Sequence, residues 1–227
     1  MADSMTNPRS PKLVKAPTGG AAAAVAMLER GGSVFALTKG QYSLIDVILA
    51  MLDRTGPADV WISTWSVSIR DAETAAELLR SSKIRALKLY TDKSLASVKP
   101  LYAAALVRLF GRGACRTSSI HAKIAVIQND AWSVVIRSSM NLNRNPRFEQ
   151  WDADDNPELA EFVLSWFREM DAAAPVGPDG DLSEAGRSFQ RARLTDAEIR
   201  AAVAEVTEDP GAKVAPSWAG KAPWGAR

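Results

Sequence analysis

Hydrophobic positions change period several times between residues 33 and 171. Short runs of β-branched and aromatic residues, which are typical of strands, alternate with stretches in which apolar residues recur every three or four positions, as in helices. We predict strands at 34–37, 59–67, 84–90, 120–127 and 132–136, and helices at about 43–52, 71–80, 100–110 and 157–167. This alternation favours an α/β fold, in which a mixed β-sheet is flanked by helices on both faces.

Both ends of the chain differ from this central part. Residues 1–32 are rich in Pro, Gly and Lys, which predicts a flexible N-terminal arm closed by an alanine-rich helical turn near 21–30. Residues 173–227 predict a linker, a short helix that follows the capping-box pattern Thr195-Asp196-Ala197-Glu198, and a tail containing Pro and Trp. The two tail tryptophans, Trp218 and Trp224, either form a docking peptide or pack back on the domain. The predicted central domain is therefore 33–172.

The composition is that of an ordinary globular protein, since 47% of the 227 residues are hydrophobic and 24% are charged. Cys115 is the only cysteine, so an intrachain disulfide is excluded, and we expect a small packed residue there. No apolar run reaches the length of a membrane span, and the N-terminal residues show no secretory pattern. We therefore expect a cytoplasmic protein without a membrane partner.

The net charge of +2 hides two oppositely charged segments. Residues 80–123 contain ten lysines and arginines and one acid, Asp92, whereas residues 149–181 contain ten acids and one cation, Arg168. The basic segment leads into the strand of the single histidine, which suits an anionic, phosphate-bearing ligand. Alternatively, these cations are solvated on helix surfaces and pair with the acidic segment.

The candidate chemistry lies at the ends of two predicted strands. His121 is the only histidine, so a metal site built from several imidazoles of one subunit is excluded. His121 and Lys123 are two residues apart on a strand and project to one face. Ser139 and Asn141, also two apart, follow the next strand. A nucleophile, a cation, a hydroxyl and an amide form the set that phosphoryl transfer needs.

His121, Lys123, Ser139 and Asn141 resemble the signature of the phospholipase D superfamily, H-x-K-x4-D followed by G-S-x-N. Two positions depart from it, because Gln128 stands at the Asp position, with Asp130 two residues later, and Ser138 replaces the Gly. The resemblance implies a phospholipase D-like domain at 33–172. It also implies a homodimeric nuclease whose active site uses one motif from each subunit, which would explain how one histidine suffices.

The implied mechanism is metal-independent and needs no cofactor. One His121 would attack phosphorus to form a phosphohistidine, and the second subunit's His121 would protonate the leaving oxygen. Lys123 and Asn141 would hold the non-bridging oxygens. Glu149 matches a downstream glutamate that orients the histidine in this superfamily, and fixing one ring nitrogen leaves the other free to attack.

Nucleic acid, DNA or RNA, is the expected partner, with Arg116, Arg144 and Arg147 as candidate backbone contacts. Arg144 and Arg147 could equally pair with Asp152, Asp154 or Asp155. The departures at Gln128 and Ser138 motivate an alternative function, a catalytically inactive nucleic-acid-binding or assembly module on the same fold. A third hypothesis, a lipid phosphodiesterase, lacks support because the chain has no obvious amphipathic membrane helix.

Overall fold

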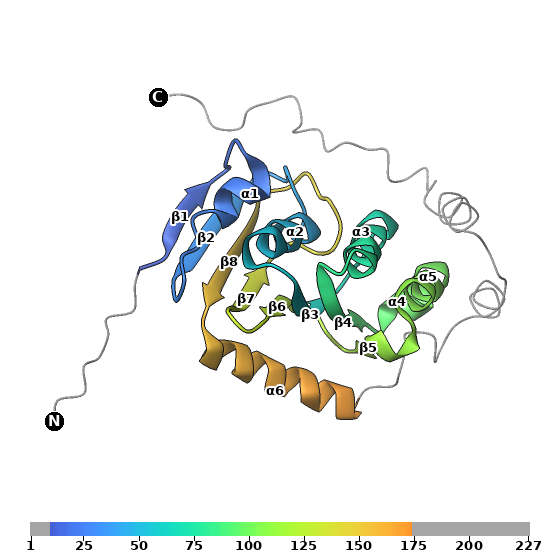
Figure 1. Cartoon of the computed structure of the whole chain (residues 1–227). Coiled ribbons are helices and arrows are strands. Elements are labelled where there is room, and N and C mark those ends of the chain that lie inside the picture. Colours follow the sequence, from blue (N-terminus) through green and yellow to red (C-terminus); the bar gives the residue numbers. More distant parts are fainter. Residues whose placement is uncertain (1–9, 174–227) are drawn as a thin grey trace, which may run out of the picture. The chain divides into compact units, whose positions relative to one another are not determined.

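The structure, a computed structural model, describes residues 10–173, all within the first of the two units Met1–Ala192 and Arg193–Arg227 into which the chain divides. Its centre is an eight-stranded mixed sheet of order β1-β2-β8-β7-β6-β3-β4-β5 (Figure 1). The strands are β1 Lys12–Lys15, β2 Ser33–Thr38, β3 Ala58–Thr64, β4 Ile84–Asp92, β5 Cys115–Ser118, β6 Lys123–Gln128, β7 Ser133–Ser138 and β8 Glu149–Asp155.

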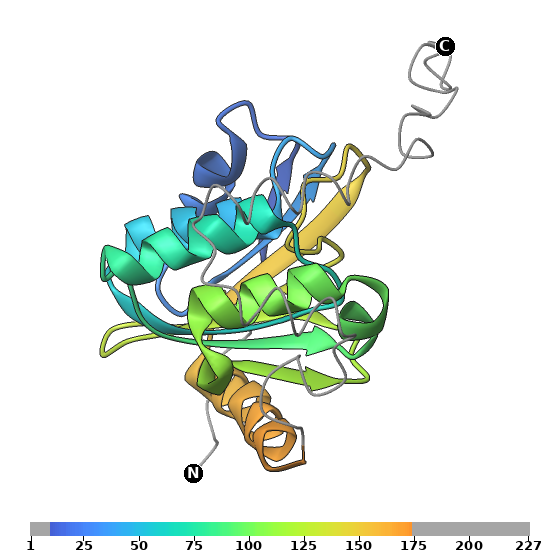
Figure 2. The ribbon, with the colours of Figure 1, turned by 90° about the vertical axis from the view of Figure 1, so that its right-hand side faces the viewer.

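Helices cover both faces of this sheet, which confirms the predicted fold class. One face carries α1 Gly20–Val25, α2 Leu44–Thr55, α3 Ile69–Arg80, α4 Ser94–Val98 and α5 Pro100–Phe110. The other face carries α6 Pro157–Ala173, which Figure 2 shows in orange on the far side of the sheet from the other helices. The domain predicted at 33–172 therefore contains most of the described elements, and α6 ends one residue beyond it.

Local sequence signals set where α2 and α3 begin. Ser43 and Asp46 form a capping box at the start of α2, in which the Ser43 backbone N–H donates to the Asp46 carboxylate over 2.8 Å. Ser68 caps α3 by accepting the backbone N–H of Asp71 over 3.1 Å. Each helix therefore follows a strand, α2 after β2 and α3 after β3, and both begin at the end of the sheet where these two strands finish.

The core under α6 consists of buried side chains from β4, β6, β7, the segment before β6 and the helix itself: Tyr90, Ile120, Val126, Val135, Ala160, Val163, Leu164 and Phe167. The rings of Tyr90 and Phe167 stack with centroids 4.6 Å apart. Ala122 and Ile124 pack against this cluster, as their alternation with His121 and Lys123 predicts. Phe162, which the helical spacing assigns to the apolar side of α6, is instead exposed.

The sequence pattern missed β8, because four of its seven residues are acidic and acidic residues are depleted in strands. The structure compensates this charge. Arg137 on β7 forms ion pairs with both Asp152 and Asp154, and Arg30 pairs with Asp155 over 2.9 Å. The Asp155 carboxylate also accepts the backbone N–H groups of Gly31 and Ser133. β8 thus occupies an interior position of the sheet, between β2 and β7.

Part of the stretch 1–32, predicted as a flexible arm, is structured. Lys12–Lys15 form the edge strand β1, which pairs in parallel with β2, and residues 20–25 form the alanine-rich helix α1. Two Lys-flanked apolar residues suffice to pair with the free edge of β2, a signal too short to recognise as a strand in the sequence. The linker, helix and tail predicted for 173–227 lie outside the described residues, apart from Ala173 at the end of α6.

Cys115 is buried, and burial raises the pKa of its thiol to about 12, which agrees with a packed residue rather than a reactive one. Between residues 10 and 173, no helix is both long enough and apolar enough to cross a membrane.

Candidate active site

His121 and Lys123 lie together where β6 begins. The Lys123 Nζ is 3.1 Å from Nδ1 and 3.2 Å from Nε2 of His121, and an ammonium group can only donate in such contacts. The histidine is exposed, whereas Lys123 is only 8% exposed. Burial lowers the pKa of the Lys123 ammonium from its ordinary value, and the negative charge of Glu149 opposes this shift. The site therefore holds a partly desolvated cation against the chain's one imidazole.

Two side chains fix the backbone around His121. The Ser63 hydroxyl on β3 donates to the carbonyl of Ala122 over 3.1 Å and accepts the N–H of Ile124 over 3.2 Å. The carboxylate of Asp92, at the end of β4, accepts the N–H of Ile120 over 3.1 Å. The strand predicted from residue 120 consequently begins at Lys123, because the residues before it are held by side chains instead of a ladder.

Asn141 is brought to the same edge of the sheet by Thr64, the last residue of β3. Thr64 Oγ1 lies 3.3 Å from Asn141 Oδ1, donates to the carbonyl of Ser66 over 2.9 Å, and accepts the N–H of Leu142 over 3.3 Å. Ser63 pairs with Ile124 across the antiparallel strands, so Thr64 lies beside Lys123. The predicted strand 59–67 ends at Thr64 because the chain turns there toward residues 140–142.

Thr64 flanks Lys123 on the β3 side, and Ser139 flanks it on the β7 side. Ser139 directly follows Ser138, which pairs with Lys123 across the two strands. The Ser139 hydroxyl donates to the Glu149 carboxylate and accepts the N–H of Gln150 over 3.0 Å. The expected role of Glu149, orienting the histidine, stays a prediction. Its hydrogen bond goes to Ser139 and its charge acts on Lys123, whereas the His121 ring contacts Lys123 and Trp65.

The side chains at the two positions that depart from the superfamily pattern, Gln128 and Ser138, form hydrogen bonds with neighbouring groups. The Gln128 amide, at the far end of β6 from His121, donates to the Ser133 hydroxyl over 3.3 Å. The Ser138 hydroxyl donates to the carbonyl of Gln150 over 3.2 Å and accepts the N–H of Met140 over 2.9 Å. Ser138 therefore braces the turn that carries Ser139 and Asn141, and Gln128 lies away from the candidate chemistry.

The three arginines predicted to contact nucleic acid have different environments. Arg116 is mostly buried, its Nε lies 3.2 Å from Asp171, and it donates to the carbonyls of Gly113 and Cys115. A contact of Arg116 with a nucleic-acid backbone stays a prediction, and it would compete with this ion pair. Arg144 and Arg147 are exposed and have no ion-pair partner among residues 10–173.

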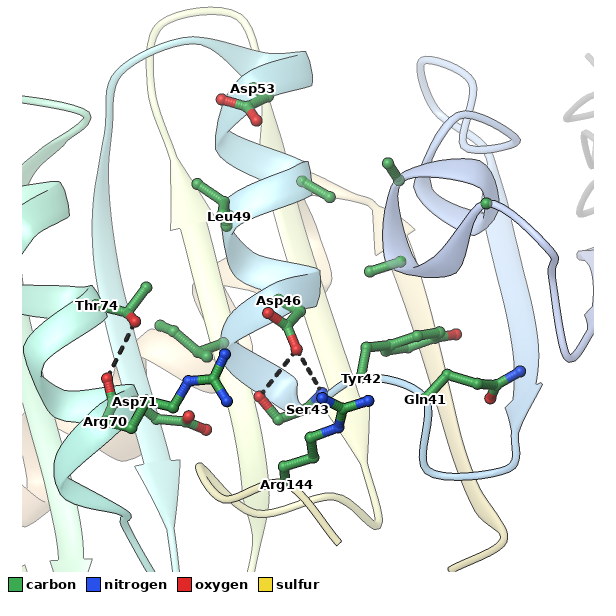
Figure 3. A pocket seen from close by; sticks show the side chains of 15 residues that line it. Gln41, Tyr42, Ser43, Asp46, Leu49, Asp53, Arg70, Asp71, Thr74 and Arg144 are labelled. Atoms are coloured by element: carbon green, nitrogen blue, oxygen red, sulfur yellow. Dashed lines mark hydrogen bonds between the residues drawn. The ribbon is translucent and has the colours of Figure 1, made fainter. Parts of the chain in front are cut away.

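The expected alternative for Arg144 and Arg147, pairing with the acids of β8, is wrong, because those acids pair with Arg137 and Arg30. Arg144 lines a cleft of about 420 Å³. Figure 3 shows its side chain in front of the first turn of α2, with Arg70 on the α3 side. The cleft also contains the carboxylates of Asp46 and Asp71. Arg144, three residues after Asn141, is thus an exposed cation on the face that carries α2 and α3, and it forms no ion pair within residues 10–173.

Half of the ten cations of the basic segment 80–123 pair with acids. Arg80 pairs with Glu77, Lys83 with Asp53 and Arg85 with Asp59, which lie outside the acidic segment. Lys88 and Arg116 share Asp171 of the acidic segment. About half of this positive charge is therefore taken up by ion pairs within the fold, and Lys123 is the member of the segment that contacts His121.

Three residues that position the site were not recognised from the sequence: Ser63, Thr64 and Asp92. The available signal was polarity at the end of a buried strand, where Ser63 and Thr64 interrupt an apolar run and are fully buried. Within the part of the chain described, no three His, Cys, Asp or Glu side chains gather in a way that could hold a metal ion.

No family model and no curated protein match this chain. Among solved structures, NucT from Helicobacter pylori is similar at 18% identity and a TM-score of 0.46, over 64% of this chain and 99% of that one. A phospholipase D family member, Nuc from Salmonella typhimurium, is similar at 15% identity and a TM-score of 0.45, over 63% and 96%. Polyphosphate kinase from Porphyromonas gingivalis is similar at 14% identity and 0.46, over 62% of this chain and 26% of its own.

Because the identities and TM-scores are low, any activity of this chain has to be derived from its own residues.

Proposed function

We propose that this protein is a metal-independent phosphodiesterase that acts on nucleic acid through a phosphohistidine intermediate, in an active site completed by a second copy of the chain. The observation that carries the proposal is the contact between His121 and the buried Lys123 at one sheet edge, with the Asn141 and Ser139 side chains on either side. A nucleophile among fixed donors is what in-line attack on a phosphodiester requires.

In the proposed first step, a ring nitrogen of His121 uses its lone pair to bond to phosphorus, and the bond from phosphorus to the leaving oxygen breaks. The partner subunit's His121 gives its proton to that oxygen. It then takes a proton from water, whose oxygen attacks phosphorus and releases His121. Lys123 has three donors, so its ammonium can exchange the imidazole contact for a non-bridging phosphate oxygen. The Asn141 amide donates to the same phosphate.

Exposed apolar side chains beside the site support the second copy. Phe148 is 77% exposed and Leu37 is 42% exposed, and both line a hollow of about 330 Å³ together with Ser139 and Glu149. Large apolar side chains left in water next to a site are typical of a surface that a partner covers. We assign this surface to the second subunit, because one chain supplies one imidazole and the mechanism uses two.

The decisive experiment is cleavage of a labelled oligonucleotide in the presence of a chelator, followed by a rapid alkaline quench that preserves phosphohistidine. We expect cleavage by the wild-type protein, none by His121→Ala, and a nucleotide adduct on the peptide that contains His121. Ser119→Ala, two residues away and exposed, is the matched control.

Cleavage retained in His121→Ala would remove the imidazole from the mechanism. Salt-dependent binding without turnover in the wild-type protein would support the inactive binding module instead.

A further inference from the structure

Trp65 is a large aromatic side chain that the catalytic proposal does not use. It follows directly after Thr64, it is 47% exposed, and its ring centroid lies 5.8 Å from that of His121 at an interplanar angle of 48°. Leaving about half of a tryptophan side chain in water forfeits the stabilisation that burying its apolar surface would give the fold. Its exposure next to the attacking ring therefore suggests that a substrate covers it.

A small hollow continues from Trp65 toward α4. Its volume is about 120 Å³, and its lining consists of Trp65, Ser66, Ser94, Leu95, Val98 and Lys99. Val98 is 72% exposed, so a second apolar side chain is left in water at this place. The Lys99 ammonium lies 5.1 Å from the centroid of the Tyr102 ring and adds positive charge to the hollow. The surface thus combines a flat aromatic face, an apolar wall and a cation.

We propose that Trp65 stacks on an unpaired nucleobase next to the phosphate held at His121, so that the substrate is single-stranded nucleic acid. This inference rests on the proposed function and specifies its substrate. A base is joined to its phosphate through one sugar, so a ring in contact with His121 is within reach of the adjacent base. Stacking on aromatic side chains combined with backbone-directed cations is how proteins bind single strands without reading sequence.

Double-stranded nucleic acid does not fit this surface. In a duplex each base face is already stacked on its neighbour, so a tryptophan can reach it only after the base has been unstacked. A phospholipid shares the phosphodiester and could place apolar chain on Val98. However, the hollow is small, it carries Lys99, and a flat aromatic ring is part of its lining, which together favour a base.

The test measures binding in a His121→Asn background, which prevents cleavage. The probes are a fluorescent oligothymidylate, an abasic strand of the same length and a hairpin duplex, each followed by fluorescence anisotropy. The variants are Trp65→Ala, Trp65→Phe, and Phe162→Ala as a matched exposed aromatic on the opposite face of the sheet.

We expect Trp65→Ala to weaken binding of the oligothymidylate roughly tenfold, most of that loss to be absent with the abasic strand, and Trp65→Phe to recover most of the affinity. Phe162→Ala should bind as the background protein does. Equal losses on the thymidylate and abasic strands would overturn the inference, because they would show that Trp65 only shapes the site.

Tighter binding of the hairpin than of the single strand, or a Trp65-dependent affinity for phospholipid vesicles alone, would also overturn it. Cleavage of the single strand by the wild-type protein is measured separately. The stacking inference can therefore fail while the proposed phosphodiesterase activity stands, and the reverse result can be recognised as well.

Discussion

The Lys123 Nζ lies 3.1 Å from Nδ1 of His121, and burial lowers the pKa of this ammonium from its ordinary value. If charged Lys123 holds the phosphate, activity has to fall as pH rises through its lowered pKa. We therefore expect kcat/KM to decline at a pH below about 10.4, the ordinary lysine value. The pH profile of cleavage measures this, with Lys123→Arg as the comparison, because arginine stays charged and should lack the alkaline decline.

The free energy of unfolding should also depend on the protonation of Lys123, but it should rise with pH where the activity falls. Lys123 loses its proton at lower pH in the folded state than in the unfolded state, so the unfolded chain binds more protons between the two pKa values. The free energy of unfolding therefore rises with pH in that window. Urea unfolding at about pH 8 and about pH 10 should show this rise in the wild-type protein and a smaller rise in Lys123→Met. An equal rise in both would assign it to other groups.

Thr64 should matter for turnover although it is placed beside the chemistry and not in it. Thr64→Val removes the hydroxyl that contacts Asn141 and leaves the Leu142 N–H without its acceptor. We expect a loss of about 1–3 kcal/mol in stability and a fall in kcat on the order of 10²-fold from a misplaced Asn141. Thr64→Ser keeps the hydroxyl and should recover both quantities. A normal kcat in Thr64→Val would separate Asn141 from catalysis.

The fold class, and the proximity of the four candidate residues to one another, could be predicted because they depend on local patterns. Alternating apolar periods determine strands and helices, and His121, Lys123, Ser139 and Asn141 are close in sequence to the two strand ends that bring them together. β8 could not be predicted, because its acids are compensated by Arg137 and Arg30 from other strands and loops. The contact of Thr64 with Asn141 spans 77 residues, and no local pattern encodes it.

Arg116 also shows that a contact between residues far apart in the sequence cannot be predicted from a local pattern. Its sequence context, a basic segment just before His121, is that of a ligand contact. Its partner Asp171 is 55 positions later on α6, so only the packing of α6 on the sheet shows that this charge is already neutralised. Charge counted along a segment therefore overestimates the charge that a ligand meets, and the contribution of each cation depends on its partner in space.

The backbone of the loop that follows Asn141 passes so close to Gly40 that a side chain there would clash with it. The φ of Gly40 is +77°, and a Cβ there would lie 2.6 Å from the Cα of Pro146 and closer still to the carbonyl oxygen of Asn145. Gly56 has a similar φ of +81° and open space around it. We expect Gly56→Ala to cost about 1–3 kcal/mol from backbone strain, since its ψ of −175° is extended, and Gly40→Ala roughly 1–3 kcal/mol more from the clash. Chemical unfolding of both variants measures the difference, and equal costs would mean that the loop gives way.

Arg144 and Arg147 should contribute to nucleic-acid affinity through phosphate contacts. Each alanine variant should weaken binding similarly for all sequences and reduce the slope of log K against log salt by about one unit. Arg80→Ala is the control, because Arg80 is exposed but already paired with Glu77 on α3. Titrations at several salt concentrations give the slopes. A slope reduced equally by Arg80→Ala would show a general charge effect and no contact by the two loop arginines.

The composite active site makes a quantitative prediction for mixed dimers. If each catalytic event uses two imidazoles, a dimer of one wild-type and one His121→Ala subunit is inactive. After complete exchange of equal amounts, about one quarter of dimers carry both rings, so activity should fall to about half of that of the unmixed wild-type subunits. Independent subunits would show no fall in activity, and subunit exchange is verified with differently tagged chains.

A variant of the proposed interface tests the same mechanism. Leu37→Asp places a charge on that interface and should give monomers without activity. Full activity in a monomeric Leu37→Asp protein would exclude the two-subunit mechanism and leave His121 to act alone.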